Sequence, residues 1–257
     1  KASYNWECTD IEQAPTEAVQ NNLRTTYGIN RRSALTELPG FNVTKQLPQD
    51  IMHTLMEGTV QYEMGLVLLY FIQNGDTTLA KLNSATLNHN YGYSETSDKP
   101  GPIRETVFLG EERYKLKYNA AQTRLFLRVL PSILSPVIDT SVEHYTFLVE
   151  LIQIVQIVFA PVIKLESVQY LKWMIQEHLT KFKELFPEMN ITPKQHYLLH
   201  IPGMTKNLGP LLRLSCFSFE SAHSYFKEMA RKQNFKNLPL SLPKKTGPVI
   251  GMLQFWR

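Results

Sequence analysis

Apolar residues recur at helical spacing through the middle of the chain. Between Ile51 and about Gln73 they return every three or four positions, and Asn74-Gly75 ends the pattern, so we predict a largely buried helix. Three more helical segments are predicted, separated by prolines, which interrupt a regular helix. They lie near 119–130, 141–159 and 164–186, with Pro131, Pro136 and Pro161 separating them. The last segment is amphipathic, because one face is apolar and lysines lie elsewhere.

The remaining segments have weaker patterns. Residues 1–30 are polar and show little periodicity, and residues 83–118 are rich in Asn, Tyr, Gly and Pro, which is typical of a loop. Two short strands are predicted, at Gly40–Leu47 and at Leu211–Phe217. The chain from Leu238 is rich in proline and is predicted to be loose. The predicted fold class is therefore mostly α (α+β), with few short strands.

Two further helix starts are predicted toward the C-terminal end. Pro193 follows Thr192, a residue type that caps helices, and the short helix that they begin carries His196 and His200. The stretch from Ser218 to Lys227 resembles the first turns of another helix.

Composition narrows the class of protein only moderately. The chain has 257 residues, of which 43% are hydrophobic and 19% charged, and this balance argues against long disordered tails. A formal charge of +4 permits DNA as a partner without indicating it. The only cysteines, Cys8 and Cys216, exclude a disulfide framework and a complete thiolate zinc site, and favour a reducing compartment. We expect neither a signal peptide nor a membrane span, so the predicted location is nuclear or cytoplasmic, not secreted.

The first candidate site lies where Leu47-Pro48-Gln49-Asp50 leads into the first predicted helix. Two interpretations are open. In one, Asp50 is an N-cap that accepts a backbone N–H, and His53 is simply a polar residue of the helix. In the other, Asp50 is a metal-binding carboxylate that His53 orients.

Glu220 has a similar setting, because it also follows a predicted strand and begins a predicted helix. Two such carboxylates can hold Mg²⁺ ions, which stabilise the attacking and leaving oxygens in phosphodiester chemistry. They can also form the acid and base of a glycosidase, for which the sequence offers no sugar cleft. His223 follows Glu220 by three residues, as His53 follows Asp50.

His196 and His200 are four residues apart, so on a helix both rings can reach one Zn²⁺. Two histidines packed in a hydrogen-bonded corner explain the spacing equally well. Further zinc ligands would come from His53, His223, Cys216 or outside the chain. Basic residues also gather toward the C-terminal end, where they either contact phosphates or form a solvated helix face: Arg213, Lys227, Arg231, Lys232, Lys236, Lys244 and Lys245.

Several blocks, taken in order, resemble one family. They are Leu47-Pro48-Gln49-Asp50-Ile51-Met52-His53 with Leu55-Met56-Glu57-Gly58, His196-Tyr197-Leu198-Leu199-His200, Gly209-Pro210-Leu211, Phe219-Glu220-Ser221-Ala222-His223-Ser224-Tyr225-Phe226-Lys227 and Asn234-Phe235-Lys236-Asn237. Together they resemble the CACTA (EnSpm)-type transposases, which are transposon-encoded relatives of the V(D)J recombinase catalytic subunit. The resemblance runs from about Thr26 to Leu242.

The resemblance implies an RNase H-like nuclease core with a DDE triad, a large helical insertion and Mg²⁺ or Mn²⁺ as cofactor. Asp50 matches the second acid and Glu220 the final glutamate, with His53 and His223 in supporting positions. His196 and His200 match a histidine pair that helps to hold a structural Zn²⁺ in the recombinase relative. The implied parts, expected to form one compact unit, are a partial core at 1–82, the insertion at 83–190, and the histidine pair, glutamate helix and tail at 191–257.

Three departures from the family pattern point to an inactive fragment. The first aspartate of the triad is expected upstream of Lys1, Cys8 stands alone where a C-x-x-C pair is usual, and Phe217-Ser218 replaces a Met-Arg pair. We therefore expect a transposase-derived protein, ancestrally a DNA strand-transfer nuclease and inactive as this chain. Its expected partners are DNA and a second copy of itself, with no membrane and no small-molecule substrate. The alternative is a non-catalytic helical module that binds DNA or a protein.

Overall fold

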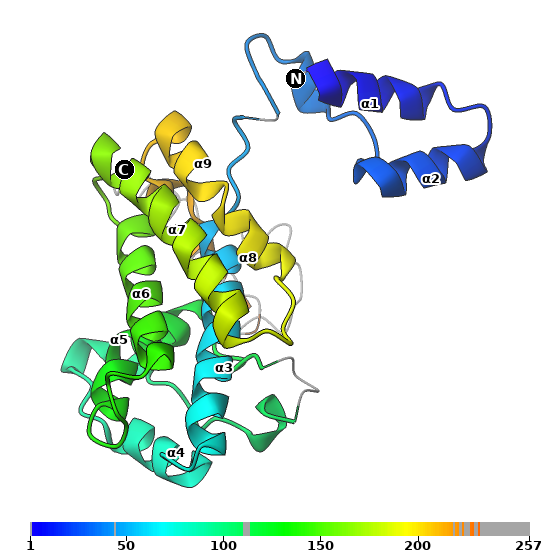
Figure 1. Cartoon of the computed structure of the whole chain (residues 1–257). Helices are drawn as coiled ribbons and strands as arrows, with labels where there is room; N and C mark the ends of the chain where they lie inside the picture. The colour runs from blue at the N-terminus through cyan, green and yellow to red at the C-terminus, as the bar shows by residue number, and fades with distance from the viewer. Residues whose placement is uncertain are drawn as a thin grey trace. The chain divides into compact units, whose positions relative to one another are not determined.

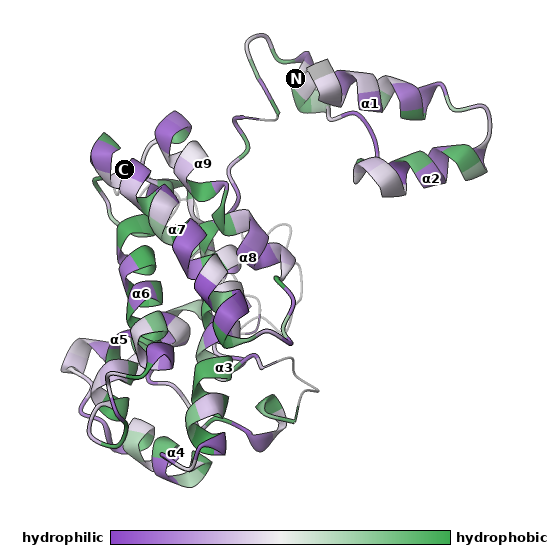
Figure 2. Cartoon of the chain, in the orientation of Figure 1, coloured by the Kyte–Doolittle hydropathy of each residue, from purple (hydrophilic) through white to green (hydrophobic). Residues whose placement is uncertain are grey.

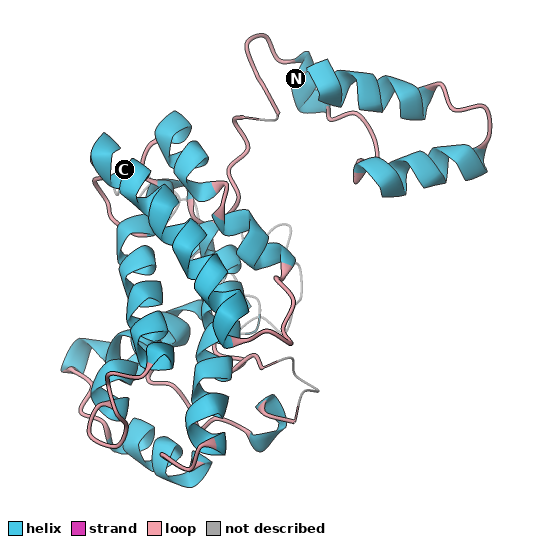
Figure 3. Cartoon of the chain, viewed as in Figure 1, coloured by secondary structure: helices cyan, strands magenta, loops and turns pink. Residues whose placement is uncertain are grey.

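The computed structural model describes residues 2–43, 45–109 and 114–217, together with residues 219, 220, 223, 227, 228 and 231. Helices and loops make up these residues, and none of the described residues lies in a β-strand (Figure 3). The prediction of a mostly α protein is therefore confirmed. The chain divides into two compact units, residues 1–214 and 215–257, and each is described by itself.

Both predicted strands are wrong. At Gly40–Leu47 the backbone turns, because the N–H groups of Lys45 and Gln46 both donate to the carbonyl of Asn42. Leu211–Leu214 forms a short 3-10 helix, η5. A short apolar run does not by itself distinguish a strand from a helical turn, and a strand needs a partner strand for its hydrogen bonds. The described part of each segment has no such partner.

The N-terminal segment, which shows little periodicity in the sequence, forms a helical hairpin of α1 (Ala2–Glu12) and α2 (Glu17–Tyr27) (Figure 1). Polar contacts and one ring contact join the two helices, and of the described residues of α1 and α2 only Cys8 and Ile11 are buried. The hydroxyl of Tyr27 donates to Asp10 at 2.6 Å, and the Tyr27 ring meets Trp6 edge-on at 5.9 Å. This explains why a search for helical periodicity did not find the hairpin. A short 3-10 helix, η1 (Ala34–Glu37), follows.

The helix predicted between Ile51 and Gln73 is confirmed, in two parts. Its first part, η2 (Met52–Thr59), is a π-helix, and its second part, α3 (Val60–Gln73), is an α-helix. At their junction the N–H of Val60 donates to the carbonyl of Leu55, five residues earlier, which is the π-helical pattern. Most residues of the two elements are buried, so this helix forms the centre of the core.

The predicted loop at 83–118 begins later than expected, because α4 (Leu79–Asn88) occupies its first residues. Thr78 caps α4, and the side chain of Asn83 exchanges two hydrogen bonds with the backbone of Ile103. This exchange ties the later chain to the helix. Two 3-10 helices, η3 (Tyr93–Asp98) and η4 (Glu105–Val107), follow in the segment that was predicted to be irregular.

The three predicted central helices are confirmed as α5 (Ala120–Leu134), α6 (Glu143–Val158) and α7 (Leu165–Leu185). They pack around η2 and α3, and Figure 2 shows hydrophobic residues along α3 and α6. Pro131 was expected to separate two helices but lies inside α5. The helix continues past it because Leu130, Ile133 and Leu134 are buried in the core, and Ser135 still donates to the Pro131 carbonyl.

The short helix predicted at Pro193 is confirmed as α8 (Pro193–Leu198), and α9 (Ile201–Leu208) follows. Thr192 caps α8 in a reciprocal arrangement with Gln195. In the second unit, the described residues between 219 and 231 are helical, as expected after Ser218. Lys232, Lys236, Lys244, Lys245 and the tail from Leu238 lie outside the described residues. Of the helices described, none combines the length and hydropathy needed to cross a membrane.

Candidate functional site

Asp50 stands at the entrance to the π-helix η2, and its carboxylate is fixed there by His53. The Oδ2 atom accepts the backbone N–H of His53 at 2.9 Å and lies 2.5 Å from His53 Nδ1. Asp50 therefore caps the helix start, as one of the two interpretations required. Its side chain is 18% exposed, so the carboxylate is accessible as well as fixed. Capping and metal binding are compatible at this position.

The imidazole of His53 lies between two carboxylates. Its Nδ1 contacts Asp50, and its Nε2 lies 3.8 Å from Oε2 of Glu57, one helical turn further along. The His53 and Glu57 side chains are 46% and 38% exposed. A ring held in this way fixes the orientation of the Asp50 carboxylate, which is the function of a histidine beside a metal-binding acid.

Helix α8 packs against η2 through Lys194. The Lys194 ammonium donates to the carbonyl of His53 at 2.7 Å and to the carbonyl of Glu57 at 3.2 Å. Burial lowers the pKa of Lys194, and the nearby charge of Lys115 lowers it further, while Glu57 acts in the opposite direction. Gly58 makes room for the lysine stem, because a Cβ atom there would lie 2.2 Å from Lys194 Cδ. The fold thus brings the Asp50 segment into contact with the segment that carries the histidine pair. Lys194 and His53, which the hydrogen bond joins, are 141 residues apart in the sequence.

Gln195, which follows Lys194 in α8, belongs to a fully buried polar cluster. The other two members of the cluster are Glu63 and His178. One Glu63 oxygen lies 2.8 Å from Nε2 of His178, and the other accepts from the Gln195 amide at 2.8 Å. The His178 ring stacks on Phe147 with centroids 4.1 Å apart. None of the three polar side chains is more than 1% exposed. The cluster joins α3, α7 and α8, and it is a structural element rather than an accessible site.

The histidine pair is exposed and its rings are close. His196 lies in α8 and His200 directly precedes α9, with ring centroids 5.2 Å apart at an angle of 81°. Within the described ranges, no third histidine, cysteine or carboxylate joins them to make a three-ligand group. A tetrahedral zinc site needs four ligands, so these residues supply half of one.

The remaining candidates belong to the second unit. Glu220 and His223 are helical and exposed, and the Glu220 N–H donates to the carbonyl of Cys216 at 2.8 Å. Glu220 is thus an exposed carboxylate in the first turns of a helix, as the sequence predicted. Asp50 and His53, by contrast, belong to the first unit.

Comparison with models of known protein families, with curated proteins and with solved structures found no match to this chain.

Sequence reasoning did not identify Lys194 or the cluster of Glu63, His178 and Gln195. One signal was present, because Glu63 lies between apolar residues in the middle of the predicted helix, and a buried carboxylate requires a partner. The partner His178 is 115 residues away in the sequence, and no local pattern identifies it. Lys194 gave no signal, since a lysine in a short exposed helix is ordinary.

Proposed function

We propose that this chain derives from a DDE-type transposase with an RNase H-like core, in which Asp50 and Glu220 bind Mg²⁺ or Mn²⁺. The proposal rests on the ordered resemblance to the CACTA-type family. One structural observation supports it most directly: the carboxylate of Asp50 is accessible and fixed by two contacts from His53. The partners implied are DNA and a second copy of the chain, and the implied location is the nucleus.

The residues fit a hard divalent cation at Asp50. Carboxylate oxygens are the ligands that Mg²⁺ prefers, and a ligating carboxylate is normally oriented by a further hydrogen bond, as His53 provides. The π-helix adds support, because such segments are frequent at functional sites. A bound divalent ion would supply charge stabilisation for phosphodiester cleavage. His53 orients the carboxylate, and Lys194 holds the carbonyls of the helix that carries both.

The chain by itself is proposed to be a weak nuclease or an inactive one, since its matched residues provide two acids of the triad. His196 and His200 are proposed as two nitrogen ligands of a zinc site that needs further ligands from outside the described residues. This second assignment is the less complete, because two ligands do not close a tetrahedral site.

Mn²⁺ binding by the whole chain tests the proposal, with plasmid nicking measured beside it. The informative variant is Asp50→Asn, because asparagine caps a helix as well as aspartate does but lacks the charge. We expect Asp50→Asn and Glu220→Gln each to weaken Mn²⁺ binding at least about tenfold, and nicking to be weak or absent throughout.

The matched control is Asp139→Asn, which removes an exposed aspartate whose carboxylate caps the turn at Ser141. It should leave Mn²⁺ binding unchanged. If Asp50→Asn binds Mn²⁺ as the original chain does, the metal assignment is wrong. Strong nicking that disappears in Asp50→Asn would instead show that the chain is a competent enzyme.

A second candidate is a non-catalytic helical binding module. It is favoured by the all-helical structure of the described ranges. If this candidate is right, the original chain and the Asp50→Asn variant should bind a labelled DNA duplex with the same affinity, and salt should weaken the binding of both.

A further inference from the structure

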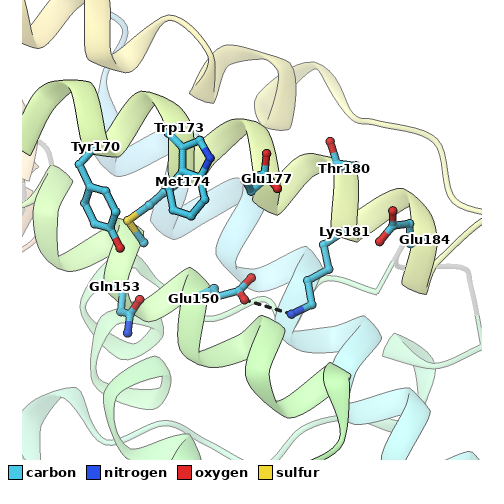
Figure 4. Close-up of a pocket in the computed structure, with 9 residues that line it drawn as sticks. All are labelled: Glu150, Gln153, Tyr170, Trp173, Met174, Glu177, Thr180, Lys181 and Glu184. Atoms are coloured by element: carbon cyan, nitrogen blue, oxygen red, sulfur yellow. Dashed lines mark hydrogen bonds and ion pairs between the residues drawn. The ribbon is translucent and has the colours of Figure 1, made fainter.

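Helices α6 and α7 leave an open groove of about 400 Å³ between them, and none of the candidate residues above lines it (Figure 4). The groove combines aromatic, acidic and polar side chains. Its lining residues are Glu150, Gln153, Tyr170, Trp173, Met174, Glu177, Thr180, Lys181 and Glu184.

Two aromatic rings of α7 lie exposed at one end of the groove. Tyr170 and Trp173 are one turn apart, with ring centroids 5.7 Å apart and planes inclined by 26°. They are 51% and 54% exposed, although tryptophan is usually well buried. Met174 beside them is buried and adds an apolar surface. The two π faces are therefore available to a ligand, and aromatic faces attract cations.

Acidic side chains follow the aromatic pair along the same face of α7. Glu177 is four residues after Trp173, and Glu184 is two turns further on. Glu150 of α6 is paired with Lys181 at 3.0 Å, the contact drawn in Figure 4. In the part of the chain that the structure describes, Glu177 and Glu184 have no ion-pair partner. The groove is thus negative by two charges, on a chain whose formal charge is +4.

We propose that this groove binds a basic peptide segment of a partner protein, with an arginine or lysine side chain against Trp173 and Tyr170. The cation contacts the aromatic faces and forms ion pairs with Glu177 and Glu184. Charge selects this occupant: an acidic peptide or a nucleic acid would be repelled by the glutamates. A purely apolar occupant would bury the two glutamate charges without giving them a partner, and burying an unpaired charge costs free energy.

The test is fluorescence anisotropy with a labelled nona-arginine peptide, compared with a nona-citrulline peptide of the same shape without charge. We expect the intact chain to bind nona-arginine and not nona-citrulline. Trp173→Ala should weaken binding about two- to fivefold, the size of an exposed cation–π contact, and Trp173→Phe should weaken it less. Glu177→Gln combined with Glu184→Gln should weaken it about tenfold, the sum of two exposed ion pairs.

The matched control combines Glu143→Gln and Glu166→Gln, which remove the same charge from the first turns of α6 and α7, outside the groove. These substitutions should change binding less than twofold. Equal weakening by the control pair would show non-specific attraction and overturn the proposal. Self-association of the intact chain that Trp173→Ala abolishes would assign the groove to a second copy and also overturn it. Circular dichroism confirms that each variant remains folded.

Discussion

At the scale of single residues, two glycines show how the same substitution has opposite effects in different surroundings. At Gly65, in α3, an added Cβ would lie 1.9 Å from the carbonyl oxygen of Tyr114, which is backbone and does not rotate away. At Gly203, in α9, an added Cβ meets nothing within 4 Å. Helix propensity therefore decides the effect at Gly203, and steric overlap decides it at Gly65.

We expect Gly65→Ala to lower the free energy of unfolding by about 2 kcal/mol or more, because the overlap forces the backbone to shift. Gly203→Ala should raise it by up to about 1 kcal/mol, since alanine favours the helix. Urea unfolding followed by circular dichroism measures both. If Gly65→Ala proved as stable as the original chain, the close approach of Tyr114 to α3 would be incorrect.

Some residue roles can be read from the sequence and others cannot. The cap at Asp50 and the capping box at Thr192 were predictable, because both depend on residues three positions apart. The role of Lys194 was not predictable, because it donates to the carbonyls of His53 and Glu57, which only the fold brings within hydrogen-bond distance. Local hydrogen bonding is encoded locally, whereas contacts between distant segments depend on the packing.

At the scale of elements, buried helices were predicted well and weakly patterned ones were not. The continuous helix of η2 and α3 lies close to its predicted range, as do α6 and α7, because each carries apolar residues at helical spacing. The α1–α2 hairpin was missed because polar and ring contacts join its helices. The predicted end of α5, just before Pro131, was too early. Burial of the neighbouring side chains outweighs the loss of the one backbone hydrogen bond that proline cannot donate.

Three elements depend on one carboxylate. Glu63 of α3 contacts His178 of α7 and Gln195 of α8, and all three side chains are at most 1% exposed. We expect Glu63→Leu to lower the free energy of unfolding by about 3 kcal/mol, because leucine leaves the buried side chains of His178 and Gln195 without their hydrogen-bond partner. Chemical denaturation measures the change.

The comparison variant for Glu63 is Glu150→Leu, which breaks the half-buried surface contact to Lys181. Such surface pairs contribute at most about 1 kcal/mol, so its effect should be much the smaller. Equal effects of the two variants would contradict a structural function for the buried cluster.

At the scale of the whole molecule, we expect one histidine to contribute to a dependence of stability on pH. His144 stacks on Tyr70 with ring centroids 3.4 Å apart, and burial lowers the pKa of His144 below its ordinary value near 6.5, with Glu143 acting weakly in the opposite direction. In acid the unfolded chain therefore takes up a proton more readily than the folded chain does. The contribution of His144 to stability is present above about pH 6.5 and is lost as the pH falls through the folded pKa.

His144→Phe tests this dependence, because phenylalanine can keep the stacking but does not titrate. We expect the original chain to lose more unfolding free energy than the variant between about pH 7.5 and about pH 5. Urea titrations at the two pH values give the difference. Parallel losses in both proteins would show that other groups control acid stability.

The buried cluster also has a consequence for how this sequence can change over time. A glutamate inside the core is tolerated only while His178 and Gln195 accompany it, and each of these is costly without the glutamate. We therefore expect related chains either to keep all three residues or to replace them together with apolar ones. Positions 63, 178 and 195 would then vary as a set, and a chain that has lost only one of them would be an intermediate that selection removes.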